Sequence, residues 1–441
     1  MDSVNAELYR EVEPNILRRV IMATAPNSPT DAGAGNRTVI LAGRLVRPDL
    51  GVVEDNRYIL VEDGVVKEVG EPGAAIRDAE IIDLSHMTVL PGMIDCHTHL
   101  TLPASFGDLI GELRRWPAQC ALEAIPNLRA KLHSGFTVVR EAGSYWALVD
   151  VAVRDAIAQG LVEGPRMQVP GAMVTMTGGA GALTGISHEV ALPRSLTFGQ
   201  ANSPAQLRER IRDLVSNGAD VIKIFASGAV MQHGCCAPTD TEFTLEELET
   251  AVHEAACLGR KVMAHAHAPQ GIRNAVQAGV ASIEHGTMLD EEGAAMMKQR
   301  GTYLVPTLAV WEGREERKQR PAEFVARAAI IENHHDEAFR CALAAGVNIA
   351  LGSDSVVRPH DKGARELFQM VRLGMSEMGA LQAATVNAAR LMSLDDAGSI
   401  APGMRADIIA VKGDPLSDIE AMDDVRFVMQ DGIVRKNAAN D

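Results

Sequence analysis

The sequence predicts an α/β protein in which a deformed (β/α)8 barrel carries a small β-sandwich domain built from both ends of the chain. Between residues 88 and 395, short apolar segments alternate with segments of helical periodicity. Strands buried on both faces read as almost continuous apolar runs, so this alternation indicates a parallel sheet covered by helices. Eight such units favour a closed barrel over an open sheet. Strand-like segments with similar turns flank this region on either side.

Composition and charge argue against nucleic-acid-binding, membrane and secreted proteins. The 441 residues are 46% hydrophobic, which suffices for one large domain and a smaller one. A net charge of −16 argues against nucleic acid or an anionic membrane as partner. No apolar run reaches the length of a membrane span, and the N-terminus is too polar for a secretory signal. The cysteines form no CxxC pair, so we expect a reduced, cytoplasmic compartment, with a reactive thiol at Cys235 or Cys236 as a minor alternative.

Similar strand and turn patterns occur near both ends of the chain. The predicted parts are an N-terminal arm (1–35), the first part of the β-sandwich (36–88), the barrel (89–395) and the second part of the sandwich (396–441). Asp63-Gly64 and Asp431-Gly432 are typical of hairpin turns, and the segments around them, VEDGVVK and MQDGIVRK, are similar. One domain from both ends is favoured over two unrelated hairpins, because the termini of compact domains lie close together.

Eight apolar segments are the predicted barrel strands. They cover residues 89–94, 136–140, 166–174, 221–225, 261–265, 281–284, 303–308 and 347–351. The segments between them have helical periodicity. Thr244 and Glu247 form a capping-box pattern at the start of one helix. Ser203 and Ser376 are candidate N-caps of helices predicted to run to residues 215 and 392.

Side chains able to bind metal occur at five of these strands. They are His97 and His99 after the first strand, Lys223 in the fourth, His265 and His267 at the fifth, His285 after the sixth and Asp354 after the eighth. The carboxyl ends of barrel strands meet at one mouth, and imidazole with carboxylate suits zinc or a similar divalent ion. Taken singly, His285 is compatible with a core histidine and Asp354 with a helix N-cap. Their coincidence favours a metal site.

Lys223 lies inside the apolar segment Val-Ile-Lys-Ile-Phe. Burying a bare cation is costly, so burial favours the neutral amine. A neutral amine reacts with CO2 to form a carbamate, whose two oxygens are able to bridge two metal ions. The alternative is a charged lysine paired with a buried acid such as Glu284 or Asp354.

Nine segments together carry a family resemblance. They are LPGMIDCHTHL, GFTVVREAG, GADVIKIFASGAV, VMAHAHAPQGI, AGVASIEHGT, YLVPTL, AGVNIALGSDS, QAATVNAARLM and GSIAPGMRADIIAV. They cover most of residues 38–436 in order, and with them the chain resembles the amidohydrolase superfamily. The resemblance is to its binuclear imidazolonepropionase-like and Xaa-Pro-dipeptidase-like members, including ochratoxinase-like hydrolases. It implies the predicted barrel and β-sandwich, and homo-oligomers, octamers among them.

The resemblance also implies roles for the residues at the strand ends. The implied ligands are His97 and His99 for one divalent ion and His265 and His285 for the other, with zinc favoured. Carboxylated Lys223 is implied to bridge the two ions. Asp354 is implied to ligate the first ion and to act as proton shuttle. A hydroxide that bridges the ions is expected to attack an amide carbonyl, and Asp354 to pass its proton to the leaving nitrogen.

Candidate substrate contacts lie at the barrel mouth. They are His267, His188, His360 and Arg358. His267 shares a strand face with His265, so we expect it to contact a substrate carbonyl or carboxylate, or to support the ligands. Arg358 suits a substrate carboxylate, although each of the three loop residues is also compatible with simple solvation. Many relatives have histidine in a Thr-Gly-Gly-His-Gly segment where this chain has Ala180, which argues against a standard dipeptidase specificity.

These features predict a metal-dependent hydrolase of a small-molecule amide. Candidate substrates are N-acyl amino acids, ochratoxin-like amides and C-terminal dipeptides. One alternative is a cyclic-amide hydrolase or deaminase of the imidazolonepropionase type, against which Lys223 argues because such members are usually mononuclear. The other is a catalytically inactive scaffold, but such relatives usually lose ligands and none is missing here.

Overall fold

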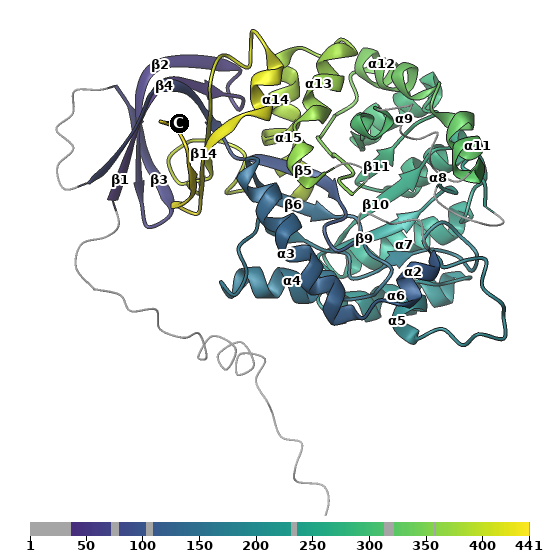
Figure 1. Ribbon diagram of the computed structural model, residues 1–441. Helices are drawn as coiled ribbons and strands as arrows, with labels where there is room; N and C mark the ends of the chain where they lie inside the picture. Colours follow the sequence, from purple (N-terminus) through teal and green to yellow (C-terminus); the bar gives the residue numbers. More distant parts are fainter. Residues whose placement is uncertain are drawn as a thin grey trace, which may run out of the picture. The chain divides into compact units, whose positions relative to one another are not determined.

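Figure 1 shows the computed structural model of the chain. The structure describes residues 37–71, 79–102, 109–230, 236–312, 322–356 and 359–440. The predicted N-terminal arm lies outside these residues, and so do Cys235 and Arg358.

One mixed seven-stranded sheet contains strands from both ends of the chain, the purple and yellow strands of Figure 1. In spatial order the strands are β15 (Ile433–Asn437), β14 (Val425–Gln430), β13 (Ile408–Val411), β4 (Glu80–Pro91), β1 (Arg37–Arg47), β2 (Val52–Glu62) and β3 (Val65–Gly70). Ile40, Leu84 and Ile408 from three neighbouring strands are fully buried in its core. The prediction that both ends share one β-structure is confirmed, whereas closure into a sandwich is not tested by these strand pairings.

Both predicted hairpin turns are confirmed. Asp63 and Gly64 have φ values of 51° and 78°, and Asp431 and Gly432 have 51° and 75°. Two successive residues with positive φ are typical of the type I′ turn, whose twist matches that of the flanking strands. The two turns lie against each other, because a Cβ on Gly64 would stand 2.7 Å from the carbonyl oxygen of Asp431. This close approach adds a second reason for glycine at position 64.

The remaining strands form two parallel sheets. The first contains β5 (Met93–Thr98), β6 (Phe136–Glu141) and β7 (Arg166–Gln168). The second contains β8 (Met173–Val174), β9 (Val221–Phe225), β10 (Lys261–Ala266), β11 (Ser282–His285) and β12 (Tyr303–Val305). All their pairings are parallel, as strands joined by helical crossovers require.

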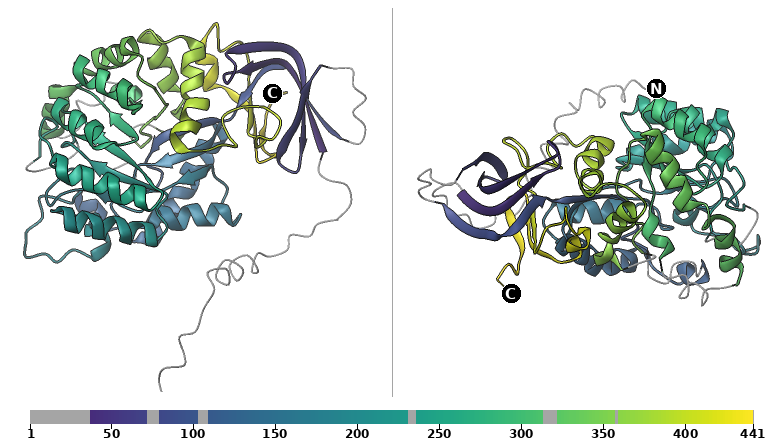
Figure 2. Two further views of the ribbon diagram at one scale, coloured as in Figure 1. Left: turned by 180° about the vertical axis from the view of Figure 1, so that it is seen from behind. Right: turned by 90° about the horizontal axis from the view of Figure 1, so that it is seen from above.

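Helices lie between the strands in sequence and pack on their outer side, as the views in Figure 2 show. The longer ones are α3 (Pro117–His133), α4 (Val149–Ala158), α6 (Pro204–Ser216), α7 (Leu245–Cys257), α8 (Pro269–Ala278), α9 (Glu291–Arg300), α11 (Ala322–Ile331) and α12 (His335–Ala345). The shorter ones are α2 (Leu109–Leu113), α5 (Arg194–Thr197), α13 (Arg365–Arg372), α14 (Glu377–Ala383) and α15 (Val386–Met392), with 3₁₀ turns η1 (Leu308–Trp311), η2 (His360–Lys362) and η3 (Ile419–Asp423). None of the helices described is both long and apolar enough to cross a membrane.

The predicted helix starts are confirmed, but one helix is shorter than predicted. Thr244 and Glu247 form the capping box of α7. The side chains of Ser203 and Ser376 cap α6 and α14. The helix predicted to run from Ser376 to residue 392 is wrong, because the backbone of Thr385 (φ −130°, ψ −96°) leaves the helical conformation and separates α14 from α15.

Two predicted barrel strands are also wrong in extent. The segment 166–174 is divided into β7 and β8 by Pro170, which has no amide hydrogen, and by Gly171, whose φ is 72°. The segment 347–351 is not a strand, and its pairing with β12 is one isolated bridge. Its Leu351 amide donates instead to the carbonyl of Ala383 at the end of α14. Closure of the barrel into eight strands therefore stays a prediction.

Candidate metal centre

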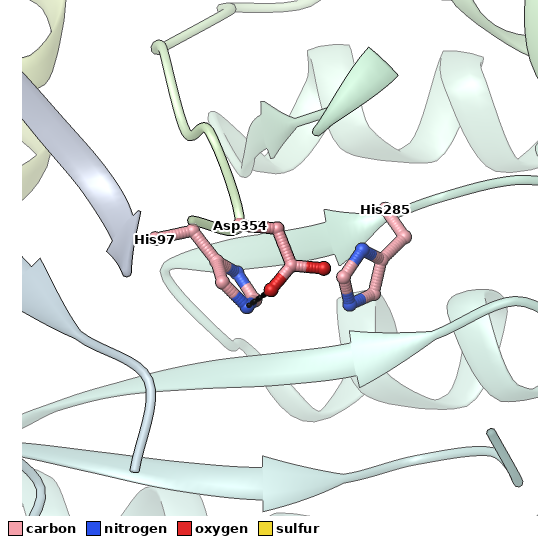
Figure 3. Close-up of side chains that lie close together, drawn as sticks. All are labelled: His97, His285 and Asp354. Carbon is pink, nitrogen blue, oxygen red and sulfur yellow. Dashed lines mark ion pairs between the residues drawn. The ribbon is translucent and has the colours of Figure 1, made fainter. Parts of the chain in front are cut away.

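Three of the predicted ligands converge in space, as Figure 3 shows. His97 comes from β5, His285 from the end of β11 and Asp354 from the loop after residue 351, and each offers a ligand atom within 4.8 Å of the other two. The Nε2 atoms of His97 and His99 lie 3.6 Å and 3.3 Å from the same oxygen of Asp354, Oδ1. Imidazoles and a carboxylate at such distances form a candidate site for a divalent ion.

His265, in β10, extends this group. Its ring centroid lies 4.6 Å from that of His285 and 4.5 Å from that of His267. The ring of His285 in turn lies 4.9 Å from that of His97. The Nε2 atom of His265 is buried with no hydrogen-bond partner in the described part of the chain. An unpartnered buried nitrogen is costly, so this atom fits a bound metal ion.

The Nδ1 atoms of three of these histidines contact partners outside the group. Nδ1 of His97 lies 2.7 Å from a carboxylate oxygen of Glu284, and Nδ1 of His99 lies 2.7 Å from the carbonyl oxygen of Gly143. Nδ1 of His285 is 2.7 Å from the hydroxyl of Thr307. Such contacts fix the ring orientation and leave Nε2 free for a metal, as in most histidine metal sites. The sequence did not identify these three partners.

Burial sets the protonation of the group. It lowers the pKa of His97, His265 and His285 well below the usual value, with neighbouring histidines or Lys223 adding to the effect. The rings are therefore neutral, as metal ligands must be. Burial raises the pKa of Asp354 to about 7, although Lys223 opposes that shift.

Lys223 lies in β9 with only 1% of its surface exposed. Burial lowers its pKa to about 8. Among the described residues its Nζ forms no ion pair or hydrogen bond, and the centroid of the Phe225 ring lies 5.3 Å away. Neither acid of the alternative forms an ion pair with Lys223: Glu284 contacts His97 and Arg140, and Asp354 lies beside His97 and His99, although the charges of both acids oppose the lowering of its pKa. A buried, unpartnered amine fits the carbamate prediction.

Glu284 and Arg140 form a fully buried ion pair behind the centre. Nη2 of Arg140 lies 2.9 Å from Oε1 of Glu284, and both side chains are at most 2% exposed. Arg140 also donates through Nε to the carbonyl of Cys96 at 2.7 Å. The pair thus connects β6, β11 and β5 and orients the ring of His97. Neither residue was among the predicted site residues, because an acid beside a histidine in sequence does not reveal which ring it supports.

We expect Glu284→Gln to weaken metal binding by about 10- to 100-fold, the usual effect of losing an outer partner of a histidine ligand. The amide keeps the shape but loses the charge that holds Nδ1 of His97 and balances Arg140. Competition with a chromophoric chelator measures the affinity. Glu62→Gln is the matched control, since its ion pair with Arg37 is partly exposed and joins β1 to β2 in the seven-stranded sheet. Unchanged affinity in Glu284→Gln would contradict this support.

Three residues around the centre have a left-handed backbone. His285, Thr307 and Asp354 have φ values of 70°, 54° and 51°. Each such conformation costs a non-glycine residue about 1–3 kcal/mol and persists only where the surroundings impose it. Two of the three are predicted ligands and the third contacts a ligand ring. Strain of this kind is typical of functional sites and cannot be read from the sequence.

The predicted substrate contacts that the structure describes differ in their burial and in their position relative to the centre. His267 is buried beside the centre, with Nδ1 2.7 Å from the hydroxyl of Thr287. His360 is 9% exposed, and its Nδ1 is buried with no hydrogen-bond partner among the described residues. Burial, with the charges of Lys131 and then His99, lowers its pKa to about 3. The side chain of His188 is 92% exposed and lies 3.0 Å from Glu189, unlike the buried histidines of the centre. Arg358 lies outside the described residues.

Comparisons with known proteins show the family of the chain. The model of the amidohydrolase family matches residues 88–435. Ochratoxinase from Aspergillus niger is 31% identical over 413 residues, covering 89% of this chain and 84% of the relative. Imidazolonepropionase from Deinococcus radiodurans is 25% identical over 385 residues, covering 83% and 87%. The crystal structure of a Xaa-Pro dipeptidase with bound methionine in its active site is 33% identical, with a TM-score of 0.84 over 90% of this chain and 99% of that one. The chain therefore belongs to the amidohydrolase family and is a metal-dependent amide-bond hydrolase.

Proposed function

We propose that the chain is a binuclear hydrolase that cleaves an amide bond in an N-acyl amino acid, an ochratoxin-like amide or a C-terminal dipeptide. The proposed ligands are His97, His99 and Asp354 for one divalent ion, His265 and His285 for the other, and carboxylated Lys223 for both. The observation that carries the proposal is the buried amine of Lys223, which forms no ion pair or hydrogen bond with the described residues and lies close enough to His97, His265 and His285 to help lower their pKa. The relatives named ochratoxinase and Xaa-Pro dipeptidase support an amide as substrate.

The residues of this chain would divide the chemistry as follows. When bound, two such ions lower the pKa of a shared water and polarise the scissile carbonyl. Asp354 would take up the proton at Oδ1 and deliver it to the leaving nitrogen. Its position between the imidazoles of His97 and His99 supports this role. His267, buried one step beyond His265, would contact the substrate carbonyl or carboxylate.

The proposal extends to the assembly. We propose zinc as the metal, a closed eight-stranded barrel with a terminal β-sandwich, and a cytoplasmic homo-oligomer that binds neither nucleic acid nor membrane. The parallel sheets and the joint terminal sheet support the fold. His188, His360 and Arg358 stay candidate substrate contacts. Among them His360 is the best supported, because its side chain is buried.

A hydrolysis panel with metal analysis tests the proposed function. The zinc-loaded protein should contain about two ions per chain and hydrolyse at least one class among N-acyl amino acids, ochratoxin-like amides and C-terminal dipeptides. One ion per chain with hydrolysis of a cyclic amide would favour the imidazolonepropionase-type alternative. Two ions without any hydrolysis across the panel would contradict the proposed substrates.

A further inference from the structure

A second buried ion pair lies beside the metal centre. It joins Lys131, from α3, to Asp95, from β5, with Nζ 2.5 Å from Oδ2 and both side chains 0% exposed. Nζ of Lys131 also lies 3.2 Å from the hydroxyl of Ser353 and 3.3 Å from that of Ser355. These two serines flank Asp354. The ammonium group therefore contacts the segment on both sides of a proposed ligand.

Asp95 connects the two segments that carry the first ligand group. Its Oδ1 accepts from the backbone amide of His97 at 3.1 Å and from that of Ser353 at 3.0 Å. Its Oδ2 accepts from the hydroxyl of Ser353 at 2.5 Å. The amide of Asp354 donates directly to the carbonyl of His97 at 2.8 Å. One carboxylate thus fixes the distance between the end of β5 and the loop of Asp354.

The ammonium group of Lys131 is tightly packed. A Cβ on Gly363 would stand 2.4 Å from Nζ of Lys131, so any side chain there would displace the ammonium. The ring centroid of Phe136 lies 4.0 Å from Nζ on another side. Gly363 directly follows η2, which carries His360. Lys131 therefore also touches the segment of a candidate substrate contact.

We propose that Lys131 is a positioning residue, which with Asp95 holds Asp354 in its left-handed conformation against His97 and His99. This inference rests on the proposed function, because it assumes that these three residues bind metal. Without the cation, Asp95 would be a buried charge without compensation, and both serine hydroxyls would lose a donor. The strained backbone of Asp354 persists only while its surroundings impose it.

Lys131→Met, studied with cobalt in place of the native metal, tests the proposal. We expect an altered cobalt absorption spectrum, because the carboxylate of Asp354 moves, and a kcat about 10- to 100-fold lower with little change in KM. Lys436→Met is the matched control. Lys436 also contacts α3, donating to the carbonyls of His133 and Val425, but not the ligand segments. It should lower the melting temperature and leave the spectrum and kcat unchanged.

The outcomes separate this inference from the proposed function. A Lys131→Met protein with a wild-type spectrum and kcat, and only a lower melting temperature, would show that the lysine is merely structural. If this variant does not fold, Ser355→Ala serves as the test in its place. It removes one hydroxyl contact of Lys131 and keeps the ion pair with Asp95. A shifted cobalt spectrum in Ser355→Ala supports positioning, and an unchanged one overturns it. Wild-type protein that binds no cobalt would overturn the proposed function itself, and this inference with it.

Discussion

Replacing Lys223 by methionine should lower kcat by about 1000-fold or more and reduce the metal content from two ions per chain to one. A metal ion supplies several kcal/mol of charge stabilisation in such reactions, and each 1.4 kcal/mol is a factor of ten in rate. Methionine fills a similar volume in β9, so the fold should persist. Metal analysis and steady-state kinetics on the zinc-loaded variant provide the measurement. Two bound ions and an undiminished kcat would rule out the bridging role of Lys223.

The carbamate itself has a separate signature. Protein exchanged into ¹³C-labelled bicarbonate should show one carbamate signal by NMR, and Lys223→Met should lack it. Lys131 is an internal comparison, because it is equally buried but has the carboxylate of Asp95 as a partner. Burial lowers the pKa of Lys131 as well, but the charge and hydrogen bond of Asp95 oppose that shift, so we expect the amine to keep its proton and not to react with CO2. A labelled signal that survives in Lys223→Met would place the carbamate on another amine.

Lys223 should also make the stability of the metal-free protein depend on pH. Burial lowers its pKa from 10.5 in the unfolded chain to about 8 in the folded protein. Between these values the unfolded chain binds more protons, so the free energy of unfolding rises as pH increases from about 8 to about 10.5. Below pH 8 the full cost of burying the charged amine remains. Urea unfolding of chelated protein in CO2-free buffer should show this rise in the wild type and not in Lys223→Met.

The convergence of His97, His265 and His285 could be predicted from the sequence because each stands at or near the end of an apolar strand. Parallel strands of one barrel end at the same mouth, so strand assignment alone brought His97, His265 and His285 together. The hairpin turns at Asp63 and Asp431 could also be predicted, because they depend only on the local preference of Asp-Gly pairs for a turn with positive φ.

What could not be predicted depends on contacts between distant parts of the chain. Gly143 supports His99 through a backbone carbonyl, a group that every residue has. The partners of Arg140 and Lys131 lie far away in sequence, and apolar helices or strands give no sign of an internal ion pair. The eighth strand is reduced to an isolated bridge because the amide of Leu351 donates to the end of a helix at Ala383, while its carbonyl accepts from Cys96 of β5; apolar periodicity does not reveal such mixed pairing. The exposure of His188 likewise depends on how its loop folds.

Asp354→Asn should lower kcat by about 100- to 10,000-fold for amides with poor leaving groups, the range that general acid–base catalysis usually contributes. Asparagine keeps an oxygen near His97 and His99 but cannot accept the proton that the leaving nitrogen needs. Asp424→Asn, a half-exposed carboxylate paired with Arg426 of β14, is the matched control and should keep wild-type kinetics.

The leaving group distinguishes a proton shuttle from a simple ligand. An anilide with an electron-withdrawing substituent leaves with little need of protonation, so Asp354→Asn should cleave it with a smaller loss of kcat than it shows for an alkyl amide with the same acyl group. Loss of a ligand alone would weaken metal binding and lower both rates by the same factor, because both substrates use the same metal centre. The ratio of the two kcat values, measured at equal metal content, therefore reports the proton transfer itself. An unchanged ratio would leave Asp354 as a metal ligand only.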